Sequence, residues 1–206
     1  MKVAVLISGS GRTLKNFIDR SAAGELSLDI RLVISSSAKA GGLQHADSAS
    51  VATRVCDRRE AASDTDYGKV VFDACRKAEV DYVLMAGFLK LVPVPDDFEG
   101  RVLNIHPSLI PAFCGHGMYG DRVHQAVLDY GAKLTGCTIH FVDNQYDAGP
   151  IIWQQPVPVF DDDTAKTLAQ RVFEAEKEAY PHVIKLLAAG KIQLEGRQVR
   201  IGECAK

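Results

Sequence analysis

The sequence has no long apolar run, and this absence excludes most classes of membrane protein. No stretch of its 206 residues approaches the roughly 20 consecutive apolar residues that cross a bilayer as a helix. The N-terminal segment MKVAVLISGSG holds only a short apolar run before a glycine turn, whereas a signal peptide needs a longer apolar core and a cleavage site. We therefore expect a first buried strand here and no membrane partner.

Neither sign of charge is in large excess. The chain has 24 Lys and Arg against 26 Asp and Glu, which gives a net charge of −2, and its pI is near 6.3. This balance provides no broad basic field, so we expect no binding to nucleic acid or to anionic membranes through bulk charge. A local anion site remains compatible with the composition.

Cysteines are few and show no pattern. The five are odd in number, and they have neither C-x-x-C spacing nor the spacing of a zinc site. A reduced, cytoplasmic compartment fits this usage, and we expect no metal. The five positions are Cys56, Cys75, Cys114, Cys137 and Cys204.

Repeats, low-complexity tracts and linkers are absent too, and the length of 206 residues favours one domain. Apolar runs rich in β-branched residues alternate with amphipathic stretches, which specifies an α/β fold: a doubly wound, mostly parallel twisted sheet with helices on both faces. The predicted buried strands start at Val3, Ile30, Val51, Tyr82 and Arg101, and the predicted helices cover Arg12–Ala22, Gly41–Ser50 and Asp66–Glu79.

The pattern changes after Pro111, where a glycine-rich loop precedes further elements. We expect a cis bond at Ile110–Pro111, because the chain must turn sharply there. Pro181 should kink or interrupt the last helix. The predicted elements are a helix over 121–131, a strand over 133–142, an edge strand over 151–159, a helix from 161–164 to 190, and a hairpin around Glu195–Gly196.

The turn LISGSGRTL joins the first strand to the first helix. Backbone N–H groups and the helix dipole converge there, which suits a phosphate. Leu14 stands where a dinucleotide G-x-G-x-x-G needs its third glycine, and no Gly-Lys-Ser/Thr follows, so neither NAD nor ATP is favoured. The alternative is a tight turn without a ligand, but Arg12 and Thr13 add a charge and a hydroxyl that favour an anion site over it.

The stretch VLNIHPSLIP places Asn104 and His106 on one side of a strand end, because side chains alternate along a strand. Ligands of open α/β sheets bind outside the carboxyl ends of the strands. Downstream, Asp147 precedes the turn residues Ala-Gly-Pro. Each of the three residues, taken alone, could have a purely structural role. Together, however, an amide that donates to an oxyanion, an imidazole that acts as acid or base, and a carboxylate that partners the imidazole suit acyl-type transfer.

Four motifs, LISGSGRTL, MAGFLKLV, LNIHPSLIP and HFVDNQYDAGPIIWQQPVPV, resemble the phosphoribosylglycinamide formyltransferase family in its order and spacing, over nearly the whole chain. The resemblance implies a Rossmann-like formyltransferase fold and a role in de novo purine (IMP) biosynthesis. It also implies one formyltransferase domain over 1–206, with a phosphate- and nucleotide-binding half over 1–100 and a catalytic and folate-binding half over 101–206.

The resemblance implies two small-molecule sites, one for glycinamide ribonucleotide and one for the cosubstrate 10-formyltetrahydrofolate. Lys90 stands where the family often has Arg, and Asp64 lies near the place of a family arginine for the folate tail. The implied contacts are Gly11, Arg12 and Thr13 for the phosphate, Glu176 for the ribose, and Leu89, Lys90, Leu91, Val92 and Asn104 for the folate. A monomer or a homodimer is expected by analogy.

Asn104, His106 and Asp147 match the family's catalytic trio. The resemblance implies that Asn104 and protonated His106 stabilise an oxyanion, while Asp147 holds the charged imidazole and assists proton transfer. Of the other histidines, His140 is a candidate supporting donor, and His116 lies in a loop where sequence leaves ligand contact and packing open. His45, His124 and His182 are expected to be surface or capping groups on helices.

Other formyl-folate enzymes share an Asn-x-His and Asp core, so they are the nearest alternatives. Methionyl-tRNA formyltransferase has a further C-terminal domain, and formyltetrahydrofolate hydrolase has an N-terminal regulatory domain; we expect neither in these 206 residues. A sugar-nucleotide formyltransferase fits the phosphate turn less well than an enzyme with a small phosphorylated acceptor. A silent binding module is the alternative from another class, and the retained trio argues against it.

Overall fold

The computed structural model describes residues 1–202, so Cys204 lies outside the described part. Within it, the chain forms two compact units. Residues 1–104 with 142–144 make up unit 1, and residues 105–141 with 145–202 make up the described part of unit 2. The strands follow the order β3-β2-β1-β4-β5-β6-β7, with a separate two-stranded β8-β9 sheet. The predicted division into halves at residue 100 stays a prediction.

Unit 1 is built from parallel strands. β1 pairs with β2 on one side and with β4 on the other, and β3 and β5 extend the order outwards. The direction of winding therefore reverses between β1 and β4, which is where open α/β sheets bind ligands. The strands are β1 (Lys2–Ile7), β2 (Asp29–Ser35), β3 (Thr53–Val55), β4 (Tyr82–Met85) and β5 (Val102–His106), of which the last two residues belong to unit 2.

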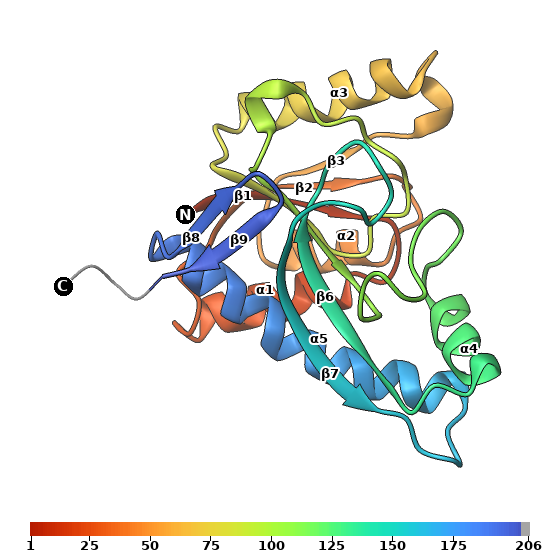
Figure 1. The fold of residues 1–206 in the computed structure, drawn as a ribbon. Coiled ribbons are helices and arrows are strands. Elements are labelled where there is room, and N and C mark those ends of the chain that lie inside the picture. Colours follow the sequence, from red (N-terminus) through yellow and green to blue (C-terminus); the bar gives the residue numbers. More distant parts are fainter. Residues whose placement is uncertain (203–206) are drawn as a thin grey trace. The chain divides into compact units, whose positions relative to one another are not determined.

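Helices flank the unit 1 strands, with α3 on one side and α1 on the other (Figure 1). Ala4 and Leu6 belong to a buried cluster that includes Tyr67 and Phe72 of α3. Because side chains alternate along β1, Val3, Val5 and Ile7 face the other side of the sheet, and all three are fully buried. The helical segments are α1 (Arg12–Ala22), α2 (Gly42–Ser48), α3 (Asp64–Lys77) and the short η1 (Arg58–Glu60) and η2 (Asp96–Phe98).

Most predicted elements of unit 1 are confirmed, and α1 has the predicted bounds. Helix α3 begins two residues earlier than predicted, because the Ser63 side chain caps it by accepting a hydrogen bond from the Asp66 N–H. The prediction of a buried strand from Val51 was wrong. β3 covers only Thr53–Val55 and all three side chains are exposed, since this strand is the last in its order.

Unit 2 contains an antiparallel pair, β6 (Leu134–Phe141) and β7 (Ile151–Pro158), against which helix α5 (Ala165–Ala188) packs. β7 is the last strand of its order, as its prolines predicted. Helix α4 (Asp121–Tyr130) ends at Gly131, which has the left-handed conformation. The remaining two strands, β8 (Ile192–Glu195) and β9 (Gln198–Ile201), form the predicted hairpin around Gly196.

The predicted effect of Pro181 was wrong in one respect, because the proline does not end the helix. α5 continues through Pro181 as one 24-residue helix. The missing N–H costs one intrahelical bond, and burial of Tyr180, Val183 and Ile184 around it offsets this loss. Thr164 and Thr167 cap the start of the helix reciprocally, near the predicted position.

Two further findings concern predictions made from the sequence. The Ile110–Pro111 peptide bond is cis, as predicted. Among the helices of residues 1–202, none combines the length and apolar character required to cross a membrane.

Candidate active site

The glycine turn of unit 1 leads directly into α1. Its N-cap residue is Gly11, which has φ +71° and, as a glycine, provides no side-chain cap to the helix. The first turn of α1 also contains no acidic residue that would repel an anion. Thr13 is buried, whereas the Arg12 side chain is exposed. The turn therefore presents the positive dipole end of a helix, without an acidic side chain in its first turn, as an anion site needs.

Only glycine fits at position 11. A Cβ atom there would lie 2.5 Å from Gly42 Cα, and the positive φ adds strain. At Gly9, two residues earlier, an added Cβ atom would meet nothing within 4 Å. We predict that Gly11→Ala lowers the free energy of unfolding by about 2 kcal/mol or more, whereas Gly9→Ala leaves it nearly unchanged. Urea unfolding of both variants measures this, and equal midpoints would contradict it.

The segment predicted to line the folate pocket follows β4. The Leu89 N–H donates to Ser8 Oγ at 2.9 Å, and Ser8 Oγ lies 2.7 Å from Ser36 Oγ, so two hydroxyls at the ends of β1 and β2 hold this segment. The side chains of Leu89 and Lys90 are exposed, and that of Leu91 is half-buried. Val92 is 1% exposed and packs in the unit 1 core, so only its backbone is open to a ligand.

β5 carries Asn104 and His106 two residues apart, so strand alternation gives both side chains the same side of this strand. Asn104 is half-buried, and its neighbour in the strand pairing is Met85 of β4. His106 is 4% exposed. The strand end therefore presents an amide and a buried imidazole in sequence, as predicted.

Within unit 2, His106 and Asp147 meet. His106 Nδ1 lies 3.4 Å from Asp147 Oδ2, and the exposed fractions of the two side chains are 5% and 12%. The Gly115 N–H donates to the same carboxylate oxygen at 2.9 Å. His140 Nε2 lies 3.8 Å from Asp147 Oδ1. The carboxylate therefore lies between two buried imidazoles and accepts one backbone hydrogen bond.

Both ring nitrogens of His106 face acceptors. Nε2 lies 2.9 Å from the Phe113 carbonyl oxygen, which can only accept, so this nitrogen carries a proton. Nδ1 faces the Asp147 carboxylate. The imidazolium form can donate to both acceptors at once, whereas either neutral tautomer leaves one acceptor without a donor. This geometry suits a charged hydrogen-bond donor.

Two residues of the site hold unusual backbone conformations. Phe113 and Asp147 both have φ +52°, in the left-handed region that non-glycine residues rarely adopt. Such conformations cost about 1–3 kcal/mol and persist where the surrounding contacts determine them. Here the Phe113 carbonyl accepts from His106 and, at 3.3 Å, from Ser108 Oγ. The strained residues are therefore the ones that contact His106.

Sequence reasoning missed the side chains that hold the loop after His106. Thr138 Oγ1 accepts from the Ile110 N–H at 3.1 Å and donates to the Ser108 carbonyl at 2.7 Å. Gln154 Nε2 donates to the Ile110 carbonyl at 2.8 Å and to Thr138 Oγ1 at 3.1 Å. A threonine and a glutamine on strands of unit 2 give little local sign of such a role, because their partners are at least 16 residues away in sequence.

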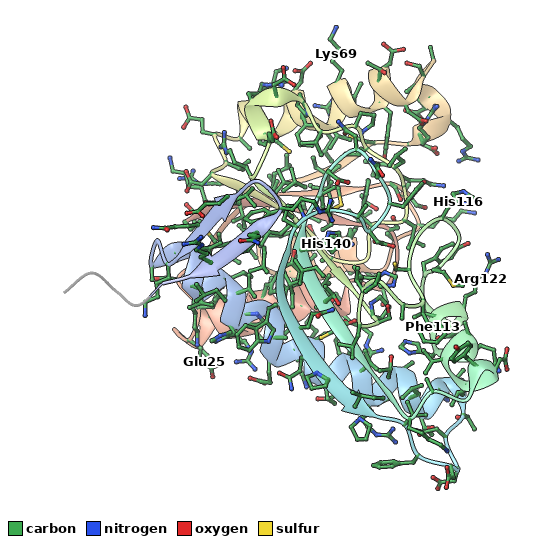
Figure 2. All side chains as sticks on the ribbon, viewed as in Figure 1. Glu25, Lys69, Phe113, His116, Arg122 and His140 are labelled. Carbon is green, nitrogen blue, oxygen red and sulfur yellow. The ribbon has the colours of Figure 1, made fainter. Side chains whose placement is uncertain are left out.

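Figure 2 shows Phe113 and His116 on the segment that leads into α4, Arg122 at the start of α4, and His140 on β6. The His116 and Tyr146 rings meet edge to face, with their centroids 5.4 Å apart. His116 is exposed, so its contact is a ring contact at the surface. His182 is exposed too, as predicted, and its ring lies against Trp153.

The prediction for His124 was wrong. This residue of α4 is 4% exposed, and its Nδ1 atom has no hydrogen-bond partner. The reason is its place on the apolar face of α4, next to Val123 and one turn before Val127, both fully buried. Burial lowers the pKa of His124 below 6.5; the nearby Asp121 opposes this in part, and the nearby His106 adds slightly to it.

The lowered pKa of His124 makes stability depend on pH. Below about pH 6.5 the unfolded chain binds a proton here that the folded chain resists, so stability falls as the pH falls through this value. When the pH falls from about 7 to about 5, the free energy of unfolding of the unchanged protein should decrease. We predict that the decrease is about 1 kcal/mol smaller in His124→Leu. Urea unfolding at several pH values measures this. His182→Leu is the exposed control, and parallel curves for His124→Leu and the unchanged protein would contradict the prediction.

Glu176 lies half-buried on α5. Its charge contributes to the raised pKa of Cys137, about 12, although burial of this thiol is the larger cause. The side chain therefore faces the β6 side of the helix rather than only solvent.

Within residues 1–202, no group of three His, Cys, Asp or Glu side chains is arranged to hold a metal ion.

Comparison with curated proteins gives three informative relatives. The chain is 34% identical, over 94% of its length, to the phosphoribosylglycinamide formyltransferase of Haemophilus influenzae and covers 90% of that protein. It is 41% identical to a chloroplastic phosphoribosylglycinamide formyltransferase of Vigna unguiculata, over 93% of this chain and 62% of that one. Against the trifunctional purine biosynthetic protein adenosine-3 of Gallus gallus it is 40% identical, over 94% of this chain but only 19% of that protein. The chain thus spans less than two thirds of the last two.

Solved structures agree with the predicted fold class. Glycinamide ribonucleotide transformylase 1 of Symbiobacterium toebii is similar with a TM-score of 0.92 and 38% identity, covering 98% of this chain and 94% of that one. A formyltetrahydrofolate deformylase of Pseudomonas syringae shares the fold alone, with a TM-score of 0.86 at 21% identity over 98% of this chain and 66% of that one. The formyl transferase family model matches residues 1–184. By this match and by the Haemophilus influenzae relative, the chain belongs to the formyl transferase family, among the phosphoribosylglycinamide formyltransferases.

Proposed function

We propose that the protein transfers the formyl group of 10-formyltetrahydrofolate to the amine of 5-phosphoribosylglycinamide, a step of de novo purine biosynthesis. The observation that carries this proposal is the buried His106–Asp147 pair, 3.4 Å apart, in a chain whose relatives bear the name of this activity. A buried imidazole whose Nδ1 faces a carboxylate can act as a charged donor to an oxyanion once its Nε2–H turns from the Phe113 carbonyl to the substrate.

The neutral amine of the acceptor attacks the formyl carbon, and a new C–N bond forms while the carbonyl electrons move to oxygen. The Asn104 amide and the His106 imidazolium donate to this oxyanion, because both side chains belong to the same side of β5. For this, the His106 Nε2–H exchanges the Phe113 carbonyl for the oxyanion, while Nδ1 stays on Asp147. Collapse of the tetrahedral intermediate re-forms the carbonyl and breaks its bond to folate N10. The amine loses one proton and N10 gains one, so the products are tetrahydrofolate and the formylated ribonucleotide.

Asp147 keeps the imidazole of His106 oriented and charged, and it assists the proton transfer. The contacts that support this role are the 3.4 Å approach to His106 Nδ1 and the Gly115 N–H that fixes the same carboxylate oxygen. His140 faces the other oxygen at 3.8 Å and supports the carboxylate from a buried position. The pair therefore acts as a unit, in which either partner alone would be a buried charge.

Substrate binding uses backbone groups at two places in unit 1. The start of α1 at Gly11, Arg12 and Thr13, with the positive end of the helix dipole, binds the phosphate of the acceptor. Segment 89–92 binds the folate: Leu89 and Lys90 have exposed side chains, the side chain of Leu91 is half-buried, and Val92 offers its backbone only. Glu176 of unit 2 binds the ribose through its carboxylate.

A reduced, cytoplasmic location accompanies this proposal. Four cysteines, Cys56, Cys75, Cys114 and Cys137, lie within the described residues, and all four are free thiols. Three of them are buried, where oxidation would disturb packing.

An acceptor-dependence assay tests the proposed function. Purified protein with 10-formyltetrahydrofolate and glycinamide ribonucleotide should release tetrahydrofolate, followed by absorbance, and yield a ribonucleotide heavier by one formyl group. Folate release at the same rate without the acceptor would instead identify a hydrolase of the deformylase kind, which shares this fold. Absence of folate release under both conditions would identify a silent binding module.

A further inference from the structure

The hairpin formed by β8 and β9 lies beyond residue 184, where the match to the formyl transferase family model ends. Arg197 occupies the turn between its two strands, directly after Gly196. Its Nη2 atom donates to the carbonyl oxygen of Ala148 at 2.8 Å. This bond joins residues 49 positions apart and connects the hairpin to the turn that carries Asp147.

The receiving carbonyl belongs to the residue after Asp147. Asp147 holds a left-handed conformation, with φ +52°, so its carboxylate direction depends on how the neighbouring peptide groups are held. On the carboxylate itself, Gly115 N–H fixes one oxygen. On the backbone, Arg197 fixes the next peptide group. A guanidinium is a planar donor and holds a carbonyl in a defined direction.

The Arg197 side chain is exposed, but the hairpin backbone that carries it is held in place. Four residue pairs join its strands, from Ile192 with Ile201 to Glu195 with Gln198. The Gly202 N–H donates to the Lys191 carbonyl at 2.9 Å and closes the open end. β9 also contacts β7, the strand that begins just after the Asp147 turn. The hairpin and the turn therefore share one support.

We propose that Arg197 is a positioning residue for the formyl transfer, acting through the Ala148 carbonyl on the direction of the Asp147 carboxylate. This inference rests on the proposed function, because Asp147 is the group that orients His106 in it. Arg197 donates to the backbone of the turn and not to the carboxylate, so its loss leaves the charges of the pair in place and changes only how tightly Asp147 is aimed.

The test compares Arg197→Ala, Arg197→Lys and the control Arg200→Ala. Arg200 lies on the same hairpin and is also exposed, but its ion-pair partner is Glu195, at 3.1 Å, rather than the backbone of the Asp147 turn. Arg197→Ala should lower kcat by about three- to tenfold, the range of one hydrogen bond, here an exposed one, with KM for either substrate changed less than about twofold. Arg197→Lys should recover most of this loss, since an ammonium can also donate to the carbonyl. Arg200→Ala should match the unchanged protein.

Hydrogen exchange of the peptide covering residues 145–150 gives a readout that does not depend on activity. Arg197→Ala should speed exchange in this peptide but not in the peptides of α3. If the unchanged protein is active, and Arg197→Ala has the same activity and the same exchange in this peptide, the positioning role is overturned while the proposed function stands. No acceptor-dependent turnover by the unchanged protein would overturn the proposed function instead. A loss of kcat that lysine does not restore at all would also count against the hydrogen bond as the cause.

Discussion

Replacing His106 with glutamine is expected to lower kcat by about a hundred- to a thousandfold, while the dissociation constants of both substrates change little. Glutamine can still donate a neutral hydrogen bond towards the Phe113 carbonyl, which accepts from His106 at 2.9 Å. It cannot carry the positive charge that the proposed mechanism requires of the ring beside Asp147. The loss therefore falls on the charged transition state rather than on the bound substrates.

Steady-state and single-turnover kinetics, together with calorimetric binding of each substrate, measure this effect. His182→Gln is the matched control, because His182 is an exposed histidine that packs against Trp153. The control should retain full turnover. A His106→Gln variant with a kcat within about threefold of the unchanged protein would remove His106 from the chemistry, since one lost oxyanion donor alone costs far more than that.

Replacing Asp147 with asparagine is expected to lower kcat by about a hundredfold or more. Asparagine tolerates the left-handed conformation of this position as well as aspartate does, so the turn backbone should persist. The amide lacks the negative charge that faces the imidazoles of His106 and His140. The asparagine side chain also has an NH₂ group in place of one carboxylate oxygen, so a donor then faces a neighbouring donor where Asp147 accepts a hydrogen bond.

Rapid-quench measurement of the chemical step, with circular dichroism and urea unfolding to verify the fold, tests this prediction. Asp161→Asn is the matched control, since Asp161 is an exposed aspartate that pairs with Lys133 at 2.6 Å. Asp147→Asn should keep the binding of both substrates. Full single-turnover rates in this variant would show that the carboxylate does not orient or charge His106.

The fold could be predicted from sequence because its signals are local. The bounds of α1 follow from a glycine turn and an apolar periodicity, and the edge place of β7 follows from its prolines. The exposure of β3 could not be predicted from such local signals. Its position at the end of the strand order depends on which strands pair, and a short β-branched run reads the same at an edge and in the centre.

The residues of the site likewise fall into those that local sequence predicts and those that depend on distant contacts. The spacing of Asn104 and His106 is a property of one strand, and sequence reasoning found both. The Gly115 N–H, the Thr138 hydroxyl and Gln154 contribute through contacts between residues 16 to 44 positions apart, which periodicity does not report. Burial of His124 was missed because one histidine on an amphipathic helix can face either side.

The central claim is that the formyl carbon passes from folate to the glycinamide amine. The measurement that tests it most directly uses 10-formyltetrahydrofolate labelled with carbon-13 in the formyl group, incubated with the unchanged protein and glycinamide ribonucleotide. The account predicts that NMR and mass spectrometry find the label in a new amide of the ribonucleotide, one label for each tetrahydrofolate released. Recovery of the label as formate, with the ribonucleotide unchanged, would contradict it.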